Sequence, residues 1–311
     1  MTIRVLYDDD VTTLITMREA VDVMSECFRR HGDGQLTAPA RHAAKLGCGE
    51  LVFTVGGYQD DDGGRVGFRV YDMEHFGSED RDELVAVFDA SRGSLRGLVA
   101  GGALGPLRTG AIGGVAVDVL ARSDASCLAL VGTGKQARTQ LMAACAVRTF
   151  SEIRAFSRTD SRCRAFCQSM SDELELEIRP TTSAEDAVAD ADVVICSTIS
   201  STAVIESDWI SPGTHIQNVG PKFRGNCEVP LSLYSRADVV ATDAPAQLAA
   251  YGDTFLLAGT PDADRVVALG DVCSGQKPGR TSADQITVLC SLGLAGTEVA
   301  LADRLLDRAG D

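Results

Sequence analysis

The sequence predicts an α/β protein whose second half is a doubly wound parallel sheet. From Cys127 onward, apolar segments typical of strands alternate with segments typical of helices. The strands are expected at residues 127–131, 153–157, 176–179, 192–196, 214–219 and 238–242. After Asp192 the fourth of these is continuously apolar, as a parallel strand covered on both faces must be. A glycine-rich turn at 132–134 follows the first strand and begins a helix, an order typical of the doubly wound fold.

The composition is that of a globular protein and excludes several function classes. The chain has 311 residues, 45% hydrophobic and 23% charged, enough for one large domain or two of medium size. Acidic residues outnumber basic ones by 44 to 29, and the net charge of −15 repels nucleic-acid phosphates and anionic lipids. We therefore expect neither nucleic acid nor a membrane surface as a partner.

The predicted location is the cytoplasm. No apolar run approaches the length of a membrane helix, about 20 residues, and residues 1–10 lack the basic start and apolar core of a signal peptide. The ten cysteines contain no Cys-x-x-Cys pair, and several lie in apolar runs, as Cys127 and Cys196 do. Such thiols behave as small hydrophobic side chains, so we expect a reduced protein without a metal site.

The first hundred residues predict a smaller unit of helix and strands. Thr16 and Glu19 form a capping-box pattern, and the apolar residues after them recur at helical spacing. Strands are expected at 51–54, 66–71 and 84–89, separated by turns rich in Gly and Asp. A Gly-rich stretch at 101–105 leads into an apolar helix that ends near Leu120. From Thr281 to the end of the chain, the apolar spacing predicts helix again.

The glycine-rich turn is predicted to bind the pyrophosphate of a dinucleotide cofactor. Gly132 permits a tight turn after the strand, and Gly134 lets the pyrophosphate approach the backbone at the helix N-terminus. Ala137 takes the third glycine position of the Gly-x-Gly-x-x-Gly pattern and still allows close helix–strand packing. The predicted cofactor residues here are Gly132, Thr133, Gly134, Lys135, Gln136 and Ala137. The alternative is a strand–helix turn that needs glycines for its geometry alone.

The segment after the next strand predicts NADPH in preference to NADH. About twenty residues beyond the glycines, an NAD enzyme usually carries an acid that accepts from the ribose hydroxyls. Here the strand is followed by Ser157, Arg158 and Thr159, with no carboxylate before Asp160. A guanidinium flanked by two hydroxyls binds a 2′-phosphate, which an acid would repel. The alternative is that Ser157 or Thr159 only caps the following helix.

The nicotinamide half of the cofactor is expected at the ends of later strands. In a doubly wound sheet the ligand lies outside the carboxyl ends of the strands, where the strand order reverses. The residues at two such ends are Ser197, Thr198, Asn218, Val219 and Gly220. Asp243, which follows the strand at 238–242, is a lesser candidate for the same place.

Four segments give the sequence a resemblance to a known family. They are Leu107-Arg-Thr-Gly-Ala111, the 132–137 loop, Pro212-Gly-Thr-His-Ile-Gln-Asn-Val-Gly220 and Gly279-Arg-Thr281. Together they resemble the ornithine cyclodeaminase/μ-crystallin family over essentially the whole chain. The resemblance implies a Rossmann domain, residues 113–281, inserted in a smaller α+β domain of residues 1–112 and 282–311 that binds substrate and forms a homodimer. It also implies NAD(H) or NADP(H) as the cofactor and α-amino, α-imino or α-keto acids as substrates.

The resemblance also assigns substrate residues. Arg41 and Arg108 match arginines that bind a substrate carboxylate, and Thr109, in the same Arg-Thr motif, is predicted to bind the cofactor. Two guanidiniums can grip one carboxylate; the alternative for each arginine is a surface salt bridge. Arg69 stands where the family has a substrate lysine, and Lys222 where it has an aspartate. In cyclodeaminases that aspartate handles the side-chain amine of the substrate, and a lysine there would repel an ornithine ammonium.

The predicted function is an NADPH-dependent reductase that delivers hydride to the C=N or C=O carbon of a small α-imino or α-keto acid. Lys222 and Arg69 are the predicted catalytic residues. Together with Arg41 and Arg108 they would place four cations around one pocket, which is costly without anions. Lys222 is therefore expected to bind a second substrate carboxylate or to lose its proton and act as an acid–base group. The alternative is that Lys222 swings out into solvent.

Two other functions stay open at this point. One is a cyclodeaminase that recycles bound NAD⁺, and the other is a protein that binds NADPH with little turnover. Because the family's aspartate is missing, Asp72 and His75 are further candidates for supplying a proton.

Overall fold

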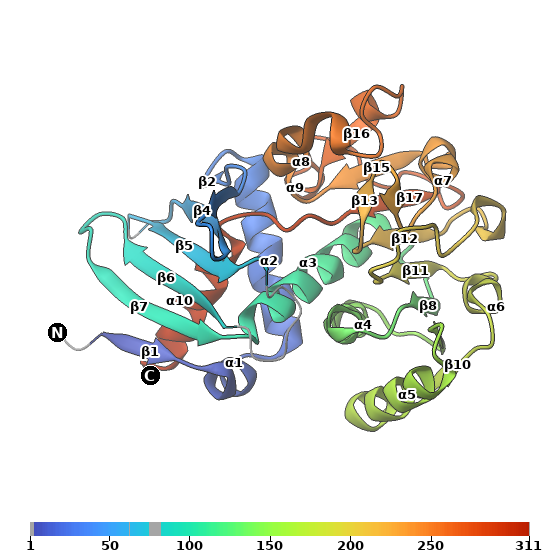
Figure 1. Ribbon diagram of the computed structural model, residues 1–311, viewed down its shortest axis with the longest axis horizontal. Coiled ribbons are helices and arrows are strands. Elements are labelled where there is room, and N and C mark those ends of the chain that lie inside the picture. The colour runs from blue at the N-terminus through green and yellow to red at the C-terminus, as the bar shows by residue number, and fades with distance from the viewer. Residues whose placement is uncertain (1–2, 62, 75–81, 311) are drawn as a thin grey trace.

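The computed structural model describes residues 3–61, 63–74 and 82–310. It contains two large sheets that lie side by side, with the long helix α3 (Leu104–Leu120) running between them (Figure 1). One sheet is built by the N-terminal part of the chain, and the other, parallel sheet is built by residues beyond Ser126. The predicted α/β class with a doubly wound parallel sheet is confirmed.

The N-terminal sheet is mainly antiparallel. Its order is β1-β7-β6-β5-β4-β2, with β3 paired to β4. Its strands are β1 (Arg4–Leu6), β2 (Leu36–Thr37), β3 (His42–Lys45), β4 (Glu50–Tyr58), β5 (Arg65–Asp72), β6 (Glu83–Asp89) and β7 (Leu95–Gly101). The three strands predicted here are therefore confirmed as parts of β4, β5 and β6. The expected helix is α2 (Met17–Gly32), whose capping box joins Thr16 N–H to the Glu19 carboxylate at 2.8 Å.

One face of this sheet is buried and the other is partly open. Gly67 of β5 faces α10 (Thr297–Arg308), since a Cβ at that position would lie 3.1 Å from the Val299 side chain. Side chains alternate along a strand, so Val66 and Phe68 point to the opposite face. Val66 is 46% exposed, and Val55 of β4, which is in register with Phe68, is 42% exposed. The face opposite α10 therefore presents apolar side chains that are partly open to solvent.

The second sheet is parallel and has the order β10-β9-β8-β11-β12-β17-β15-β16. Its strands are β8 (Cys127–Val131), β9 (Glu152–Phe156), β10 (Ile178–Pro180), β11 (Val193–Cys196), β12 (His215–Asn218), β15 (Val239–Thr242), β16 (Val266–Ala268) and β17 (Thr287–Cys290). The chain order reverses at β8, between β9 and β11, which is the switch point where ligands bind. Leu128 and Leu130 belong to one apolar cluster and Ala129 and Val131 to another, so β8 is buried on both faces.

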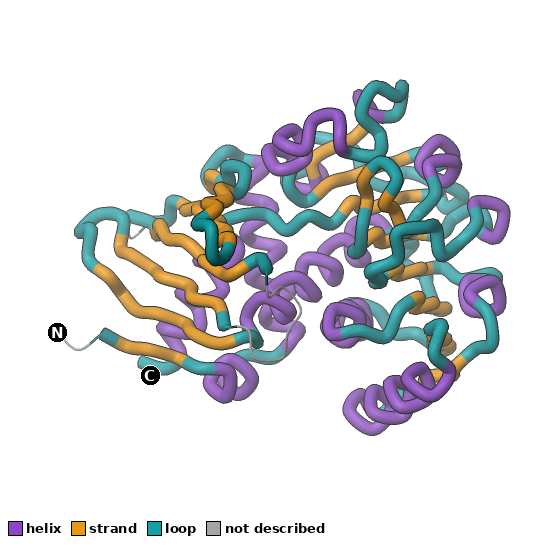
Figure 2. Tube along the Cα trace, in the orientation of Figure 1, coloured by secondary structure: helices purple, strands orange, loops and turns teal. Residues whose placement is uncertain are grey.

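Helices surround this sheet (Figure 2). They are α4 (Lys135–Val147), α5 (Asp160–Leu174), α6 (Ala184–Val188), α7 (Leu231–Arg236), α8 (Pro245–Tyr251) and α9 (Leu269–Cys273), while α1 (Asp8–Leu14) precedes α2. A small hairpin, β13 (Lys222–Phe223) and β14 (Asn226–Cys227), follows β12. Within the described part of the chain, no helix has the length and apolar character needed to cross a membrane.

Helix α3 joins the two units because its small residues let neighbours approach the backbone. A Cβ at Gly110 would lie 2.5 Å from the Thr139 carbonyl oxygen in α4, and one at Gly114 would lie 2.7 Å from the Val21 side chain in α2. Side chains at these positions would force the helices apart. The close packing holds the N-terminal half of α3, with Arg108 and Thr109, between the two sheets.

The C-terminal segment differs from the prediction. The sequence predicts helix from Thr281 onward, but residues 287–290 form β17, which pairs with both β12 and β15, and α10 begins only at Thr297. The helical prediction for this stretch is wrong because a short, fully apolar run fits a buried strand as well as a helix. The predicted domain boundary at 282 also differs from the topology, since the parallel sheet extends to Cys290.

A buried histidine in β12 makes the stability of the parallel sheet depend on pH. His215 is fully buried, its Nδ1 lies 2.9 Å from Thr287 Oγ1 of β17, and burial lowers its pKa to about 3. Below pH 6.5 the unfolded chain therefore binds a proton that the folded chain does not. The free energy of unfolding then decreases as the pH decreases.

We predict that the wild type loses about 2 kcal/mol more unfolding free energy than His215→Gln between pH 7 and pH 5. Other titrating groups are common to both proteins, so the difference isolates His215. Urea unfolding at the two pH values measures it. Equal losses in the two proteins would contradict the buried neutral imidazole.

Candidate active site

The predicted pyrophosphate turn has the required geometry. Gly132 follows β8 with φ +104°, and a Cβ there would lie 2.2 Å from the Ser197 carbonyl oxygen, so the turn requires glycine. Gly134 is the N-cap of α4, and a Cβ there would meet nothing within 4 Å. Space therefore remains above the N-terminus of α4, where backbone N–H groups attract an anion. The turn also brings Ser197 and Thr198, at the end of β11, beside the glycines.

Helix α3 borders this turn through Thr109. The Gln140 amide of α4 donates to the Thr109 carbonyl at 2.9 Å, and the Thr109 hydroxyl donates to the Gly105 carbonyl at 2.9 Å. Two side-chain oxygens in α4, Gln136 Oε1 and Gln140 Oε1, are buried and have no hydrogen-bond partner within the described residues. The fit of the 132–137 segment to a dinucleotide rests on the open space at Gly134 and the N-terminus of α4, which suit a pyrophosphate.

The segment predicted to select NADPH is exposed at the end of β9. Arg158 is open to solvent, and Thr159 is the N-cap of α5, but its hydroxyl makes no capping hydrogen bond. The carboxylate of Asp160 pairs with Arg164 at 2.9 Å, one turn further along α5. Arg158 is thus exposed directly after β9, and its role in cofactor choice stays a prediction.

A buried glutamate that the sequence analysis did not identify organises the ends of β11 and β12. Glu228 Oε2 accepts from the backbone N–H of Thr198 at 2.7 Å and from its hydroxyl at 2.8 Å, while Oε1 accepts from Gly220 N–H. With its amide oriented to satisfy Tyr234, Asn218 also donates to Glu228 Oε1 at 2.9 Å. Glu228 stands between apolar Cys227 and Val229, which was the available sequence signal. Burial raises the pKa of its carboxyl.

Two of the predicted substrate arginines are buried in an ion-pair cluster. Arg69 Nε donates to Glu83 Oε2 at 2.9 Å, and Arg69 also lies 3.5 Å from Glu298 Oε1. Arg108, 2% exposed, donates to the same Glu298 oxygen at 2.5 Å. Neither arginine forms a surface salt bridge. The two carboxylates come from β6 and α10 and lower the cost of burying the guanidiniums.

The guanidiniums of Arg41 and Arg108 both lie beside Gly293. The Arg41 guanidinium donates to the carbonyls of Leu292 and Gly293, and its backbone N–H donates to Gln247 Oε1 at 2.8 Å. Gly293 has φ +85°, and a Cβ there would lie 2.4 Å from Arg108 and 3.0 Å from Arg41. The Nε atoms of both arginines are buried and have no hydrogen-bond partner in the described chain. Two cationic donors at one place fit a carboxylate.

The segment under Arg41 is fixed by a second buried acid. Asp243, at the end of β15, accepts from Leu292 N–H at 2.7 Å, from Gly293 N–H at 2.9 Å and from the Ser291 hydroxyl at 3.2 Å. Asp243 thus lies against the end of β17, where it holds the segment whose carbonyls accept from Arg41. Its predicted place near the nicotinamide half of the cofactor stays a prediction. Burial raises the pKa of the Asp243 carboxyl.

Lys222 points inward. It is 4% exposed, and its ammonium donates to the carbonyls of Gly220 at 2.6 Å, Ser291 at 2.8 Å and Val219 at 3.3 Å. These three bonds use all three donors of an ammonium group. Swinging out into solvent is therefore not what Lys222 does here. Burial lowers its pKa, while Glu228 and Asp243 oppose that shift.

The four predicted cations do not stand alone. Arg41, Arg69, Arg108 and Lys222 share their surroundings with four buried carboxylates, Glu83, Glu228, Asp243 and Glu298. The cluster is thus close to neutral without any ligand. The repulsion that the sequence predicts between the cations is balanced by acids from distant parts of the chain. Of the two further proton candidates, Asp72 ends β5, and His75 lies outside the described residues.

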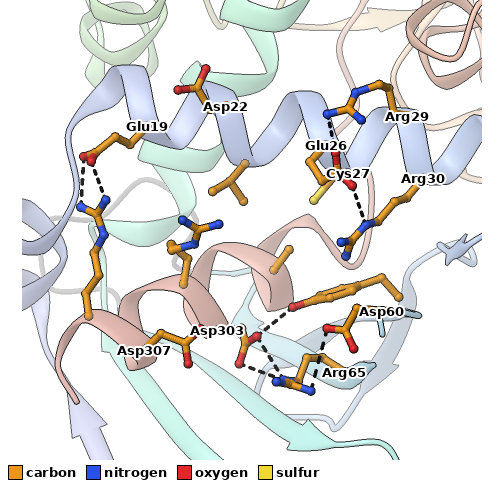
Figure 3. Close-up of a pocket in the computed structure, with 15 residues that line it drawn as sticks. Glu19, Asp22, Glu26, Cys27, Arg29, Arg30, Asp60, Arg65, Asp303 and Asp307 are labelled. Atoms are coloured by element: carbon orange, nitrogen blue, oxygen red, sulfur yellow. Dashed lines mark hydrogen bonds and ion pairs between the residues drawn. The ribbon is translucent and has the colours of Figure 1, made fainter. Parts of the chain in front are cut away.

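A separate groove lies in the N-terminal unit. It is a groove of about 700 Å³ between α2 and α10 (Figure 3). Its charges bind one another: Glu19 pairs with Arg308, and Asp303 accepts from Arg65 and from the Tyr58 hydroxyl. None of the predicted substrate or cofactor residues lines this groove. The predicted site residues therefore lie apart from this groove.

The chain belongs to the ornithine cyclodeaminase/mu-crystallin family, whose model matches residues 2–311. A Delta(1)-pyrroline-2-carboxylate reductase of Bacillus cereus is 33% identical over 245 residues, 77% of this chain and 75% of that protein. The predicted family is confirmed. At the level of the family the predicted enzyme class, an NAD(P)-dependent oxidoreductase of imino and amino acids, is confirmed as well.

Two solved structures share the fold over nearly the whole chain. The Delta(1)-pyrroline-2-carboxylate reductase of Thermococcus litoralis, in complex with NADH and L-proline, has a TM-score of 0.85 at 25% identity and covers 98% of this chain and 97% of that one. An archaeal alanine dehydrogenase dimer with bound NAD has a TM-score of 0.87 at 25% identity, covering 99% and 96%.

Proposed function

We propose that the protein is an NADPH-dependent reductase of a small α-imino or α-keto acid. The observation that carries this proposal is the convergence of Arg41 and Arg108 on Gly293, where a Cβ would lie 3.0 Å from the Arg41 guanidinium and 2.4 Å from that of Arg108. Arg41 lies near Lys222, whose ammonium bonds the carbonyls that follow β12. A carboxylate bound there would stand beside a nicotinamide resting on Thr198 and Asn218.

Each part of the site has a separate task in this reaction. The cofactor, when bound, supplies a hydride for the C=N or C=O carbon. Residues 132–137 hold its pyrophosphate on the N-terminus of α4, and Glu228 fixes the strand ends beneath its nicotinamide half. Arg41 and Arg108 hold the substrate carboxylate and so orient the neighbouring C=N or C=O carbon. Arg69, paired with Glu83 and Glu298, keeps Arg108 in place by sharing the Glu298 carboxylate.

The substrate we propose carries one carboxylate at this arginine pair. Arg69 is already paired with two carboxylates, and all three donors of the Lys222 ammonium are used on backbone carbonyls, so Lys222 has no donor left for a second carboxylate. The relatives named above reduce pyrroline-2-carboxylate or bind L-proline, compounds with a single carboxylate. A cytoplasmic location stays a prediction of the sequence.

Purified protein should oxidise NADPH when given cyclic or open-chain α-imino acids. Arg41→Lys should raise KM for the imino acid about ten- to hundredfold, because a charge-assisted hydrogen bond contributes about 1.5–3 kcal/mol. Arg304→Lys, an exposed position on α10, serves as the matched control. The measurement is initial rate against substrate concentration.

Two other outcomes would replace this function. Binding of NADPH, seen as quenching, without oxidation in a panel of keto acids plus amines would identify a binding protein. Release of proline from ornithine without net change of the cofactor would identify a cyclodeaminase.

NADPH is the proposed cofactor because Arg158 is exposed beside Ser157 and Thr159 at the end of β9. Arg158→Ala should weaken NADPH binding about ten- to hundredfold and leave NADH binding nearly unchanged. Arg162→Ala, exposed in the first turn of the following helix α5, is the control. Fluorescence titration with both cofactors tests this. Equal losses for the two cofactors, or a wild-type preference for NADH, would show that residues 157–159 only begin α5 and do not select the cofactor.

A homodimer is proposed to form through the open face of the N-terminal sheet. The partly exposed apolar residues Val55, Val66 and Phe68 suit a second copy of the same face. Light scattering of the wild type should give twice 32.8 kDa. Val55→Glu/Val66→Glu should give the monomer mass, whereas Leu231→Glu, an exposed leucine of α7, should not. A wild-type monomer at micromolar concentration would contradict this arrangement.

A further inference from the structure

The turn that follows β12 is held by two oppositely charged buried residues. The Gly220 N–H donates to Glu228 Oε1, and the Gly220 carbonyl accepts from Lys222 Nζ at 2.6 Å. A Cβ at Gly220 would lie 2.2 Å from the Thr198 carbonyl oxygen and 2.5 Å from Glu228, so Gly220 is enclosed on that side as well. Both backbone polar groups of Gly220 are therefore fixed by charged partners.

The same lysine reaches a second segment that bears on the substrate. Lys222 Nζ donates to the Ser291 carbonyl at 2.8 Å, and Ser291 begins the Ser291–Gly293 segment after β17. Asp243 holds this segment through three hydrogen bonds, and the segment's next two carbonyls accept from Arg41. Lys222 thus bonds two segments. One is the turn after β12, on which we propose that the nicotinamide rests, and the other is the Ser291–Gly293 segment, whose carbonyls accept from Arg41.

We propose that Lys222 is a positioning residue that sets the distance between the nicotinamide-bearing turn and the Arg41 carboxylate site. The inference rests on the proposed reductase function. It gives Lys222 a role other than proton transfer or recognition of a second carboxylate, because all three of its N–H donors are used on backbone carbonyls.

The physical reason for such a residue is the distance dependence of hydride transfer. The donor and acceptor carbons react from about 3–3.5 Å apart, and a displacement of about 1 Å costs on the order of a hundredfold in rate. The cofactor turn belongs to the end of β12, whereas Arg41 comes from the loop before β3. Fixing the turn after β12 to the Ser291–Gly293 segment therefore affects kcat, and it affects the affinity for cofactor or substrate only weakly.

Lys222→Met tests this role, because it keeps the length of the side chain and removes its three donors. We expect kcat with a monocarboxylic imino acid to fall about a hundredfold, with KM and the NADPH Kd changed by less than about threefold. The primary isotope effect with deuterated NADPH should rise, and both limbs of the pH–rate profile should remain. Lys277→Met, an exposed lysine, should behave as the wild type.

Asp243→Asn acts on the same segment and provides a second test. In the double variant, kcat should fall by less than the product of the two single effects. The reason is that Asp243→Asn and Lys222→Met both loosen the Ser291–Gly293 segment. Ser291→Ala, which removes one hydroxyl bond to Asp243, keeps the test possible if Lys222→Met fails to fold. It should lower kcat in the same direction by a smaller factor.

Several results would overturn the proposal. They are loss of a pH limb in Lys222→Met, a KM increase confined to dicarboxylic substrates, or wild-type kcat in Lys222→Met or in both Asp243→Asn and Ser291→Ala. A wild type that reduces no substrate would contradict the proposed function instead.

In that case crystal structures test the role of Lys222. The proposal requires the Gly220 and Ser291 carbonyls to move apart in Lys222→Met, and an unchanged distance between them would contradict it.

Discussion

The Ser291–Gly293 segment, held by the Asp243 carboxylate, is the constraint on which the candidate site depends. It follows β17, a central strand, so the parallel sheet fixes its position. Its N–H groups and one hydroxyl bind Asp243, and its carbonyls accept from Lys222 and Arg41. Gly293, which contacts Arg41 and Arg108, allows the two guanidiniums to approach. Without this segment the two units of the protein would share no common support for a substrate.

The electrostatics of the site follow from the same arrangement. Three buried cations, Arg69, Arg108 and Lys222, and the half-buried Arg41 interact with four buried carboxylates where water is scarce, so each charge depends on its partners. Removing one member of such a pair leaves an uncompensated charge, which typically costs about 3–5 kcal/mol. In the described part of the chain, the Nε atoms of Arg41 and Arg108 are among the buried donors without a hydrogen-bond partner. In the proposed function one substrate carboxylate binds these two guanidiniums, which is why we propose a small amino-acid-like compound.

Local sequence patterns predict the parts of the fold that depend on neighbouring residues. The glycine-rich turn, the capping box of α2 and the strands of the parallel sheet up to β15 lie close to their expected positions. β17 is missed because its few apolar residues carry no period that separates a strand from a helix. In a parallel sheet its neighbours are distant in sequence, and only pairing identifies it.

The candidate site was predictable in its cations and not in its anions. Arg41, Arg69, Arg108 and Lys222 follow from motif positions, whereas Glu83, Glu228 and Glu298 reach them through tertiary contacts. Glu298 is 229 residues from Arg69 and 190 from Arg108. An acid at such a separation has no local signature, and this is why the sequence suggested an unbalanced basic pocket where the fold contains a balanced one.

The most direct test of this account is a crystal structure with NADPH and a bound product amino acid. The account predicts that the carboxylate of the amino acid lies about 3 Å from guanidinium nitrogens of both Arg41 and Arg108, beside the nicotinamide at the ends of β11 and β12. A carboxylate bound instead to Lys222, or to Arg69 with Glu83 displaced, would contradict it.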